Sequence, residues 1–554
     1  MEKRTIIGIV LCMLVLFGWN PLSEFMGWRT RPNPQTTQQQ DGQPGILAED
    51  VRPMGQNAVP ADPFGQSAHP GDIAPGFPAE SSQADGKVIT VDTPLYRAKF
   101  SGRGGILLSF ELKLYTVRTH FDKSEPAAQV NLVAGTVAQA APLGILINNQ
   151  HSWRNAAWSY TGSERVELGA NQKESLTFWA DLGSMTLQRT ITFDADTYVL
   201  QEKVELRSRV AQAVSLGYSV STADLSGPED YQKITMVARV QGGEYNEESD
   251  RSTLGNGQSY GTNLTWGGNM SNYFLAAMMP PDPGFRMDAR FQNEIFTVAM
   301  KRDNISVAPE TPLQSSMNYY FGPKRVSDLQ AAPADLTTSI DYGWFAAISR
   351  PLVALLLFFN SFAGNYGISI IALTILVKLL LWPLSYKSYK SMQGMKLIQP
   401  HMQKLREKYK GDKERLNAEM MQLYKTYKIN PMGGCLPIVM QLPIFIALYK
   451  ALLYAFELRQ ASFIPYLPFT DKVWLADLSL SDPYYITPVL MGATMFIQQK
   501  MTPTTGDSTQ AKIMLFMPIV FTFMFLNFPS GLVVYWLISN IFSIAQQRWQ
   551  LRQK

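Results

Sequence analysis

Long apolar runs alternate with long polar stretches along the chain. A first apolar run, Ile6 to Trp19, follows Lys3 and Arg4. Five more apolar runs occur in the C-terminal part, near residues 366–382, 435–456, 484–500, 512–528 and 532–548. Each is apolar enough to cross a bilayer as a helix, so the pattern predicts six transmembrane helices.

The first apolar run has two interpretations, a cleaved signal peptide or a retained anchor. The residues that follow it, GWNPLSEFMGWRT, contain no convincing small-residue cleavage site. We therefore expect residues 1–28 to form a retained transmembrane signal anchor.

The charge between the apolar runs predicts their orientation. Residues 385–430 carry eleven Lys or Arg and four Asp or Glu, a net charge of +7, whereas residues 457–483 carry two and four, a net charge of −2. Because positively charged loops stay in the cytoplasm, both termini, including the short basic tail 549–554, are expected there. The region between the first two spans then lies on the outer side of the membrane, opposite the cytoplasm.

This outer region divides into two parts. Residues 29–86 are rich in Gln, Pro and Gly and are expected to be a flexible tether. From residue 87 to 335, short runs such as KVITVD and MTLQRTITF alternate apolar and polar positions, which predicts an all-β sandwich. Its histidines, His120 and His151, come with no paired-carboxylate pattern, so we expect a binding or scaffold role.

The segment 341–362 is apolar but is interrupted by Arg350 and Pro351. A span here would reverse the alternation of charge, so an amphipathic helix lying in the outer interface is the preferred interpretation. A seventh span is the alternative.

Lys378 is the residue of the second span most indicative of function. A charge inside a span is costly and by default marks a functional site, although this lysine could instead reach the nearby cytoplasmic interface. Polar residues in several spans favour a wet cavity around it. These residues are Thr374, Gln441, Gln498, Gln499, Asn540, Ser543 and Gln546.

Residues 385–430 predict a cytoplasmic helical hairpin. Apolar residues recur at heptad spacing from Met395 to Tyr409 and again from Leu416 to Tyr427, on either side of a Gly411-Asp412 turn. Pro400 is expected to kink the first helix. The methionines of the hairpin have flexible side chains, which could adapt to apolar binding partners of varied shape. Its charge enforces topology, and it could also dock on ribosomal RNA or anionic lipid.

Several classes of chemistry have no support in the composition. Cys12 and Cys435 are the two cysteines, and the sequence contains neither a GxxxxGK[ST] phosphate loop nor an HExxH motif. We expect no nucleotide, metal or other cofactor, no small-molecule substrate and no enzymatic activity.

Five stretches in order resemble the YidC/Oxa family of membrane insertases in its Gram-negative form. They are NYGISIIALTILVKLLLWPLS, KINPMGGCLPIVMQLPIFIALY, FELRQASF, SDPYYITPVLMGATMFIQQKMTPTT and NFPSGLVVYWLISN. The resemblance implies a multi-pass protein of the bacterial inner membrane. Its core would be five helices, residues 366–548, around a hydrophilic groove, and its periplasmic domain a β supersandwich similar to mutarotase-type sugar binders.

The resemblance also implies roles for single residues. Lys378 stands where family members usually carry arginine, Thr374 is the groove threonine, and Tyr535 and Trp536 match an aromatic pair of the last span. The candidate groove residues are Lys378, Thr374, Gln441, Gln498, Asn540, Tyr535 and Trp536. The candidate contacts for a client or a ribosome are Met392, Met395, Met402, Met420, Met421 and Asp507.

We therefore expect an insertase and folding factor for nascent inner-membrane proteins. Its expected partners are nascent chains, the Sec translocon, the ribosome and the phospholipid bilayer. A secondary transporter that uses Lys378 as a proton or anion site is the main alternative, although the sequence has no inverted repeat. A membrane-anchored carbohydrate enzyme is the third reading, and it leaves five spans unexplained.

Overall fold

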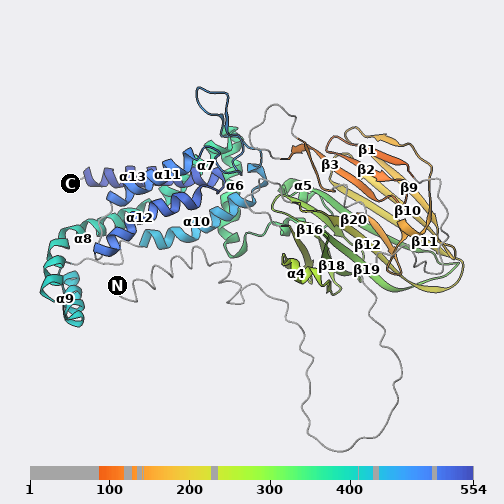
Figure 1. Cartoon of the computed structure of the whole chain (residues 1–554), viewed down its shortest axis with the longest axis horizontal. Coiled ribbons are helices and arrows are strands. Elements are labelled where there is room, and N and C mark those ends of the chain that lie inside the picture. The colour runs from red at the N-terminus through yellow and green to blue at the C-terminus, as the bar shows by residue number, and fades with distance from the viewer. Residues whose placement is uncertain are drawn as a thin grey trace, which may run out of the picture. The chain divides into compact units, whose positions relative to one another are not determined.

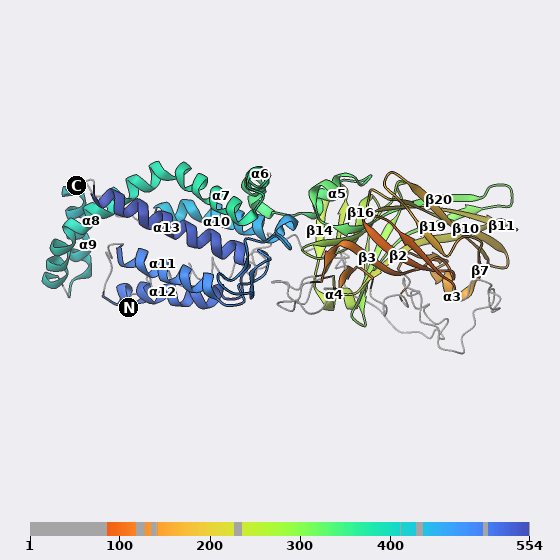
Figure 2. The ribbon, with the colours of Figure 1, turned by 90° about the horizontal axis from the view of Figure 1, so that it is seen from above.

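A computed structural model of the chain describes residues 86–117, 128–133, 140, 142–225, 235–409, 411–427, 436–501 and 508–552. The predicted signal anchor and almost all of the predicted tether lie outside these residues. The described part begins with a β-rich region and continues, from residue 346, with a helical region (Figure 1 and Figure 2).

The β-rich region forms a sandwich of sheets in which most neighbouring strands run antiparallel. One sheet has the order β4 (Gln129–Asn131), β3 (Leu107–Thr116), β2 (Tyr96–Ser101), β1 (Val88–Asp92) and β8 (Arg165–Glu167). The largest has the order β14 (Glu244–Glu248), β13 (Met236–Gln241), β16 (Leu264–Met270), β17 (Phe274–Met279), β20 (Leu313–Pro323), β11 (Val199–Ser208), β10 (Met185–Asp194), β9 (Lys173–Asp181) and β7 (Ala157–Tyr160). The third has the order β15 (Gln258–Tyr260), β18 (Arg286–Gln292), β19 (Ile295–Val307), β12 (Gln212–Thr222), β5 (Gly144–Ile147) and β6 (Gln150–His151).

Short helices complete this region. They are α3 (Ser152–Asn155), α4 (Arg251–Gly255), α5 (Val326–Gln330) and the 3-10 turn η2 (Leu336–Ser339). An all-β sandwich in residues 87–335 was predicted from the alternation of apolar and polar residues, and this coarse prediction is confirmed.

The alternation is clear in β10, where Leu187, Ile191 and Phe193 are buried. Arg189 also points inward and is fully buried, against the expectation for a charged side chain. It forms an ion pair with Glu202, and its Nη2 donates to the carbonyl oxygen of Leu143 at 2.6 Å. A buried ion pair is tolerated when hydrogen bonds satisfy both groups.

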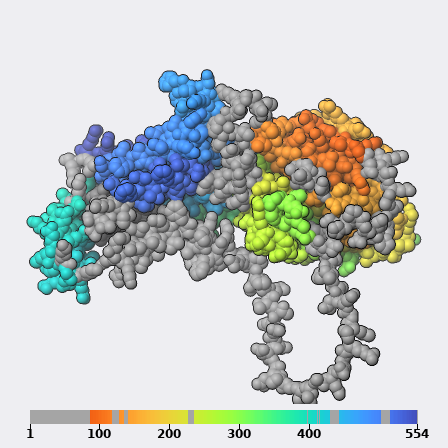
Figure 3. Space-filling view, viewed as in Figure 1, coloured from red at the N-terminus to blue at the C-terminus, as the bar shows by residue number. Residues whose placement is uncertain are grey.

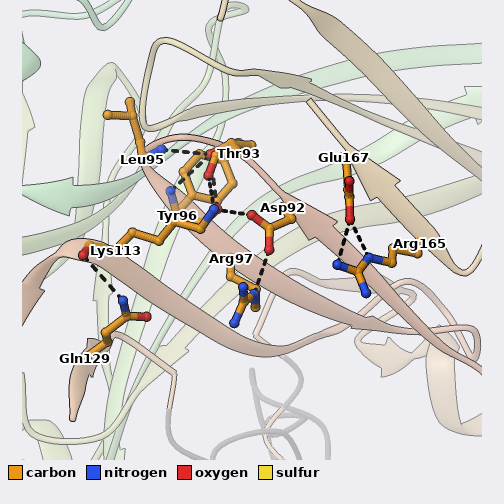
Figure 4. Close-up of polar contacts among 9 residues, drawn as sticks. All are labelled: Asp92, Thr93, Leu95, Tyr96, Arg97, Lys113, Gln129, Arg165 and Glu167. Atoms are coloured by element: carbon orange, nitrogen blue, oxygen red, sulfur yellow. Dashed lines mark hydrogen bonds and ion pairs between the residues drawn. The ribbon is translucent and has the colours of Figure 1, made fainter. Parts of the chain in front are cut away.

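Asp92, at the end of β1, makes the main polar contacts of the first sheet (Figure 4). Its carboxylate accepts from Arg97 Nε at 2.8 Å and from Lys113. Burial alone would raise the pKa of Asp92, but the hydrogen bonds and charges of Lys113 and Arg97 outweigh it and hold the pKa below its usual value. On a neighbouring strand, Arg165 pairs with Glu167 at 2.6 Å (Figure 4).

The helical region matches the predicted runs closely. Its helices are α6 (Ala346–Ala363, preceded by the turn η3, Gly343–Phe345), α7 (Tyr366–Leu380), α8 (Trp382–Lys408), α9 (Lys413–Thr426), α10 (Leu436–Tyr454), α11 (Ile486–Met501), α12 (Ser508–Phe525) and α13 (Ser530–Arg552). A turn η5 (Phe456–Leu458) and a hairpin of β21 (Ile464–Tyr466) and β22 (Val473–Leu475) join α10 to α11.

Length and composition alone single out few of these helices as spans. Among the described residues, Gly343–Ala363 is long and apolar enough to cross a membrane, and a second candidate is α7 with the start of α8, which meet at a bend of 62°. The first of these is the segment for which an interfacial helix was predicted. The apolar parts of α10 and α12 are shorter, Gln441–Tyr454 and Leu515–Phe525. The count of six spans therefore stays a prediction.

The predicted hairpin of residues 385–430 appears as α8 and α9. Asp412 caps α9 by accepting from the backbone N–H of Arg415 at 3.0 Å. Helix α8 continues through Pro400. The seam between the helices is apolar and contains Met395, Ile398 and Met402, with Met420, Leu423 and Tyr424 packed on it.

Candidate functional site

Helix α7 carries Lys378 and ends two residues later. Asn365 begins the helix, because its side-chain oxygen accepts from the backbone N–H of Gly367 at 2.9 Å and of Ile368 at 3.2 Å. The helix ends at Leu380, and the chain bends by 62° into α8. Lys378 therefore lies in the last turn before this bend.

The ammonium group of Lys378 faces the inside of the helical region. The residue is 8% exposed, and Nζ donates to Ser543 Oγ of α13 at 3.0 Å. Ser543 Oγ in turn donates to the carbonyl oxygen of Ser539 at 2.9 Å. None of the ion pairs among the described residues involves Lys378. A buried cation is thus held by a hydroxyl group without a neutralising carboxylate.

The side of α13 around Ser543 is polar although it is buried. Spacings of three and four residues put its members on one helical face. We call this face the polar stripe, and it consists of Ser539, Asn540, Ser543, Gln546, Gln547 and Gln550, each no more than 7% exposed. The start of the same helix is apolar, with Leu532, Val533 and Val534 in the core shared with α7 and α10. The buried face of α13 therefore changes from apolar to polar along its length.

Helix α11 supplies part of the surroundings of the polar stripe. Asn540 Nδ2 donates to Thr494 Oγ1 at 3.3 Å, and Gln547 Nε2 donates to the carbonyl oxygen of Met501 at 3.0 Å. Other amide atoms are buried with no hydrogen-bond partner in the described part of the chain. They are Gln499 Nε2, Gln546 Nε2, Gln547 Oε1 and Gln550 Nε2. A dry amide group without a partner costs about 1–3 kcal/mol, so these atoms favour bound water.

The other predicted groove residues have surroundings that differ from one another. Thr374 is fully buried, and its hydroxyl donates to the carbonyl oxygen of Ile370 in its own helix at 2.6 Å. Tyr535 is buried and hydrogen-bonded to Gln441. Trp536 packs in an aromatic group, with ring centroids 4.6 Å from Phe445. Asn540 thus belongs to the polar stripe and Lys378 contacts it through Ser543, whereas Tyr535 and Trp536 lie in the apolar half of α13.

Gln498 of α11 is partly buried and has polar contacts of its own. Its neighbour Gln499 carries one of the unpartnered amides. The glutamines Gln547 and Gln550 were not singled out from the sequence. Their spacing with Ser543 was the signal that could have identified them.

The predicted client-contact residues differ in exposure. Met395 and Met402 are buried in the seam of the hairpin, at 5% and 3% exposure. Met392 and Met420 are partly buried, and Met421 is 54% exposed. Asp507 lies outside the described residues. Met421 is therefore the methionine of this set most available to a partner.

A separate hollow lies on the β-rich region. It has a volume of about 400 Å³ and is lined by β7, β9, β10 and β11, with Trp179, Gln188 and Glu205 among the lining residues. Glu205 is already paired with Arg207 at 2.5 Å. Within the described residues no group of three or more His, Cys, Asp or Glu side chains could hold a metal ion.

Comparison with known proteins places both regions in one family. The YidC periplasmic domain model matches residues 88–355, and the 60Kd inner membrane protein model matches residues 358–554. A membrane protein insertase YidC of Nitratidesulfovibrio vulgaris strain Miyazaki F is 48% identical and covers 100% of this chain and 99% of its own length. That of Syntrophus aciditrophicus is 38% identical, with 100% of both chains covered.

A solved crystal structure of an active YidC insertase covers 85% of this chain and 94% of its own, with 18% identity and a TM-score of 0.36. The assignment therefore depends on the sequence relatives. Proteins of this family are insertases of the inner membrane, not enzymes in the catalytic sense, and their substrates are nascent membrane proteins. With a periplasmic β-sandwich, a helical C-terminal region and relatives matched over its whole length, this chain belongs to the YidC family of membrane protein insertases.

Proposed function

We propose that Lys378 and the polar stripe of α13 form the wet surface along which the polar part of a client enters the membrane. The observation that carries this proposal is the group of buried amide atoms without partners, next to a buried cation without a carboxylate. Such groups are costly in a dry bundle and inexpensive in a hydrated one.

The mechanism follows from this polarity. In a hydrated groove, the polar tail of a client exchanges hydrogen bonds with water and with the stripe while it moves into the membrane. The charge of Lys378 attracts acidic residues of the tail. The apolar segment of the client then moves sideways into lipid, where each central Leu or Ile contributes roughly 0.3–0.6 kcal/mol. About twenty such residues drive insertion without nucleotide hydrolysis.

The proposed topology has six spans, with both termini in the cytoplasm and the β-sandwich in the periplasm. In this topology the basic hairpin of α8 and α9 faces the cytoplasm, where it would meet the client first. Met421 and Leu397 are two exposed apolar side chains of the described part of this hairpin, at 54% and 67% exposure. Docking on the ribosome and cooperation with the Sec translocon are further parts of the proposal. The hairpin's positive charge suits docking on ribosomal RNA, and substrates that are nascent membrane proteins suit cooperation with the translocon.

Site-specific crosslinking tests the proposal. A photoreactive residue at position 378 or 543 should crosslink to a stalled nascent membrane protein. The matched control is position 379, because Leu379 neighbours Lys378 but is 53% exposed on the outer side of its helix. Equal crosslinking of a polar client tail from 379 and from 378 would contradict a groove on the Lys378 side.

A further inference from the structure

The hairpin between α10 and α11 carries an aromatic tip. Strands β21 and β22 pair antiparallel, with Ile464 opposite Leu475 and Tyr466 opposite Val473. The turn is closed by hydrogen bonds from Leu467 N to the carbonyl oxygen of Lys472, at 2.8 Å, and from Thr470 N to that of Leu467, at 3.0 Å. The tip is thus a defined turn.

The base of the hairpin is fixed to the beginnings of two helices. Phe463 packs so closely on Gly367 of α7 that a Cβ at Gly367 would lie 2.1 Å from the phenylalanine ring. On the other strand, Trp474 Nε1 donates to Asp482 Oδ1 at 2.9 Å. The second oxygen of Asp482 accepts from Thr487 N, in the first turn of α11, at 2.7 Å. The base of the hairpin is therefore held against the beginnings of α7 and α11.

Phe469 at the tip is an unfavourable residue for a free turn. Its side chain is fully exposed, and its backbone has a φ of +64°. Bulky side chains rarely adopt this left-handed conformation, and a phenylalanine in water gains nothing from burial to compensate. Strain of this kind at an exposed site points to a contact made outside the chain.

We propose that this tip inserts Phe469 into the outer-leaflet interface of the bilayer. The hairpin projects sideways from one end of the helical region, in a direction that crosses the helix axes, and forms a separate lobe (Figure 1 and Figure 3). This direction lies along a membrane surface when the helices cross the membrane. The inference therefore rests on the topology given under Proposed function.

The surroundings of the tip fit an interfacial position. Tyr466 is 46% exposed, and Tyr484 and Tyr485, at the start of α11, are 37% and 47% exposed. Aromatic side chains at the ends of spans form belts at headgroup level. Asp471 and Lys472 lie shortly after Phe469, and their charges cancel. The tip therefore combines an exposed apolar side chain with neighbouring polar residues and has no net charge. This suits a lipid interface better than the hydrocarbon centre.

The test is fluorescence of the full chain in vesicles of phosphatidylcholine and phosphatidylglycerol. Cys12 and Cys435 are replaced by Ser, and Phe469→Cys is labelled with an environment-sensitive dye. We expect emission shifted to shorter wavelength and a loss of intensity with lipids that carry a shallow quencher. Trp179→Cys on β9, also an exposed aromatic position, serves as the matched control and should show neither change.

A third label separates failure of the inference from failure of the topology. Leu379→Cys lies on an exposed side of a proposed span and should be quenched by a deep quencher. If the label at 379 is quenched and the label at 469 behaves like that at 179, the hairpin does not enter the bilayer and the inference is wrong. If the label at 379 is also unquenched, the proposed membrane placement of α7 is wrong and the inference falls with it.

Discussion

Replacing Lys378 by methionine removes the cation of the proposed groove while keeping a long side chain. Lys378 is 8% exposed and has no ion-pair partner among the described residues, so its charge remains available to a client. At an effective dielectric constant of about 20 and a separation of about 8 Å, the attraction on one acidic residue is about 2 kcal/mol. Loss of that attraction in the transition state slows insertion by about 30-fold.

The assay compares two clients that differ only in the translocated tail, one with an acidic residue and one neutral. We expect Lys378→Met to slow insertion of the acidic client about 30-fold, as measured by protease protection in proteoliposomes, and to leave the neutral client within about 3-fold. Lys378→Arg should keep both rates, because it keeps the charge. Leu379→Met is the control on the exposed side of the helix.

A slowing of both clients to the same extent would refute the electrostatic reasoning. It would show that the lysine acts through packing or through its hydrogen bond to Ser543. Unchanged rates for both clients would mean that the charge has no part in insertion.

Three further predictions follow from contacts elsewhere in the chain. The pKa of Asp92 is held below its usual value by Lys113 and Arg97, so the ionised carboxylate stabilises the fold above about pH 4, and this stabilisation is lost as the pH falls through the lowered pKa. Asp92→Asn should therefore flatten the acid dependence of thermal unfolding, and an unchanged dependence would contradict this. A Cβ at Gly492 of α11 would lie 1.9 Å from Thr522 Oγ1 of α12, so Gly492→Ala should lower the free energy of unfolding by about 1–3 kcal/mol, and adding Thr522→Ala should restore part of it. Wild-type thermal stability of the single variant would argue against this close approach. Deleting most of residues 87–320 should leave insertion in depleted cells largely intact, and loss of insertion with the remaining helices stably present would disprove it.

Much of the fold was predictable because burial imposes a period on the sequence. The alternation in MTLQRTITFD predicted β10, and the apolar run at 484–500 predicted α11, which spans Ile486–Met501. Arg189 was not predictable as a buried residue, because its partners Glu202 and Leu143 come from other segments. The local sequence pattern shows which face of a strand or helix is buried, but not which residues from other segments pack against that face.

The same limit applies to the candidate site. Lys378 was identifiable as a charge inside an apolar run, but its partner Ser543 is 165 residues away. The sequence also grouped Trp536 with the polar residues, whereas the structure places it against Phe445 and Phe525. The apolar and polar halves of α13 become distinct only when its neighbours are known.

Hydration beside Lys378 is the central claim, and the reaction of a cysteine at position 543 with a small charged thiol reagent tests it most directly. Thiols react as thiolates, which form in water and not in hydrocarbon. With Cys12 and Cys435 replaced by Ser, Ser543→Cys in native membranes should react readily, whereas Leu379→Cys, facing outward from α7, should remain unmodified. An unreactive cysteine at 543 in the folded protein would show that the polar stripe is dry and would contradict the account.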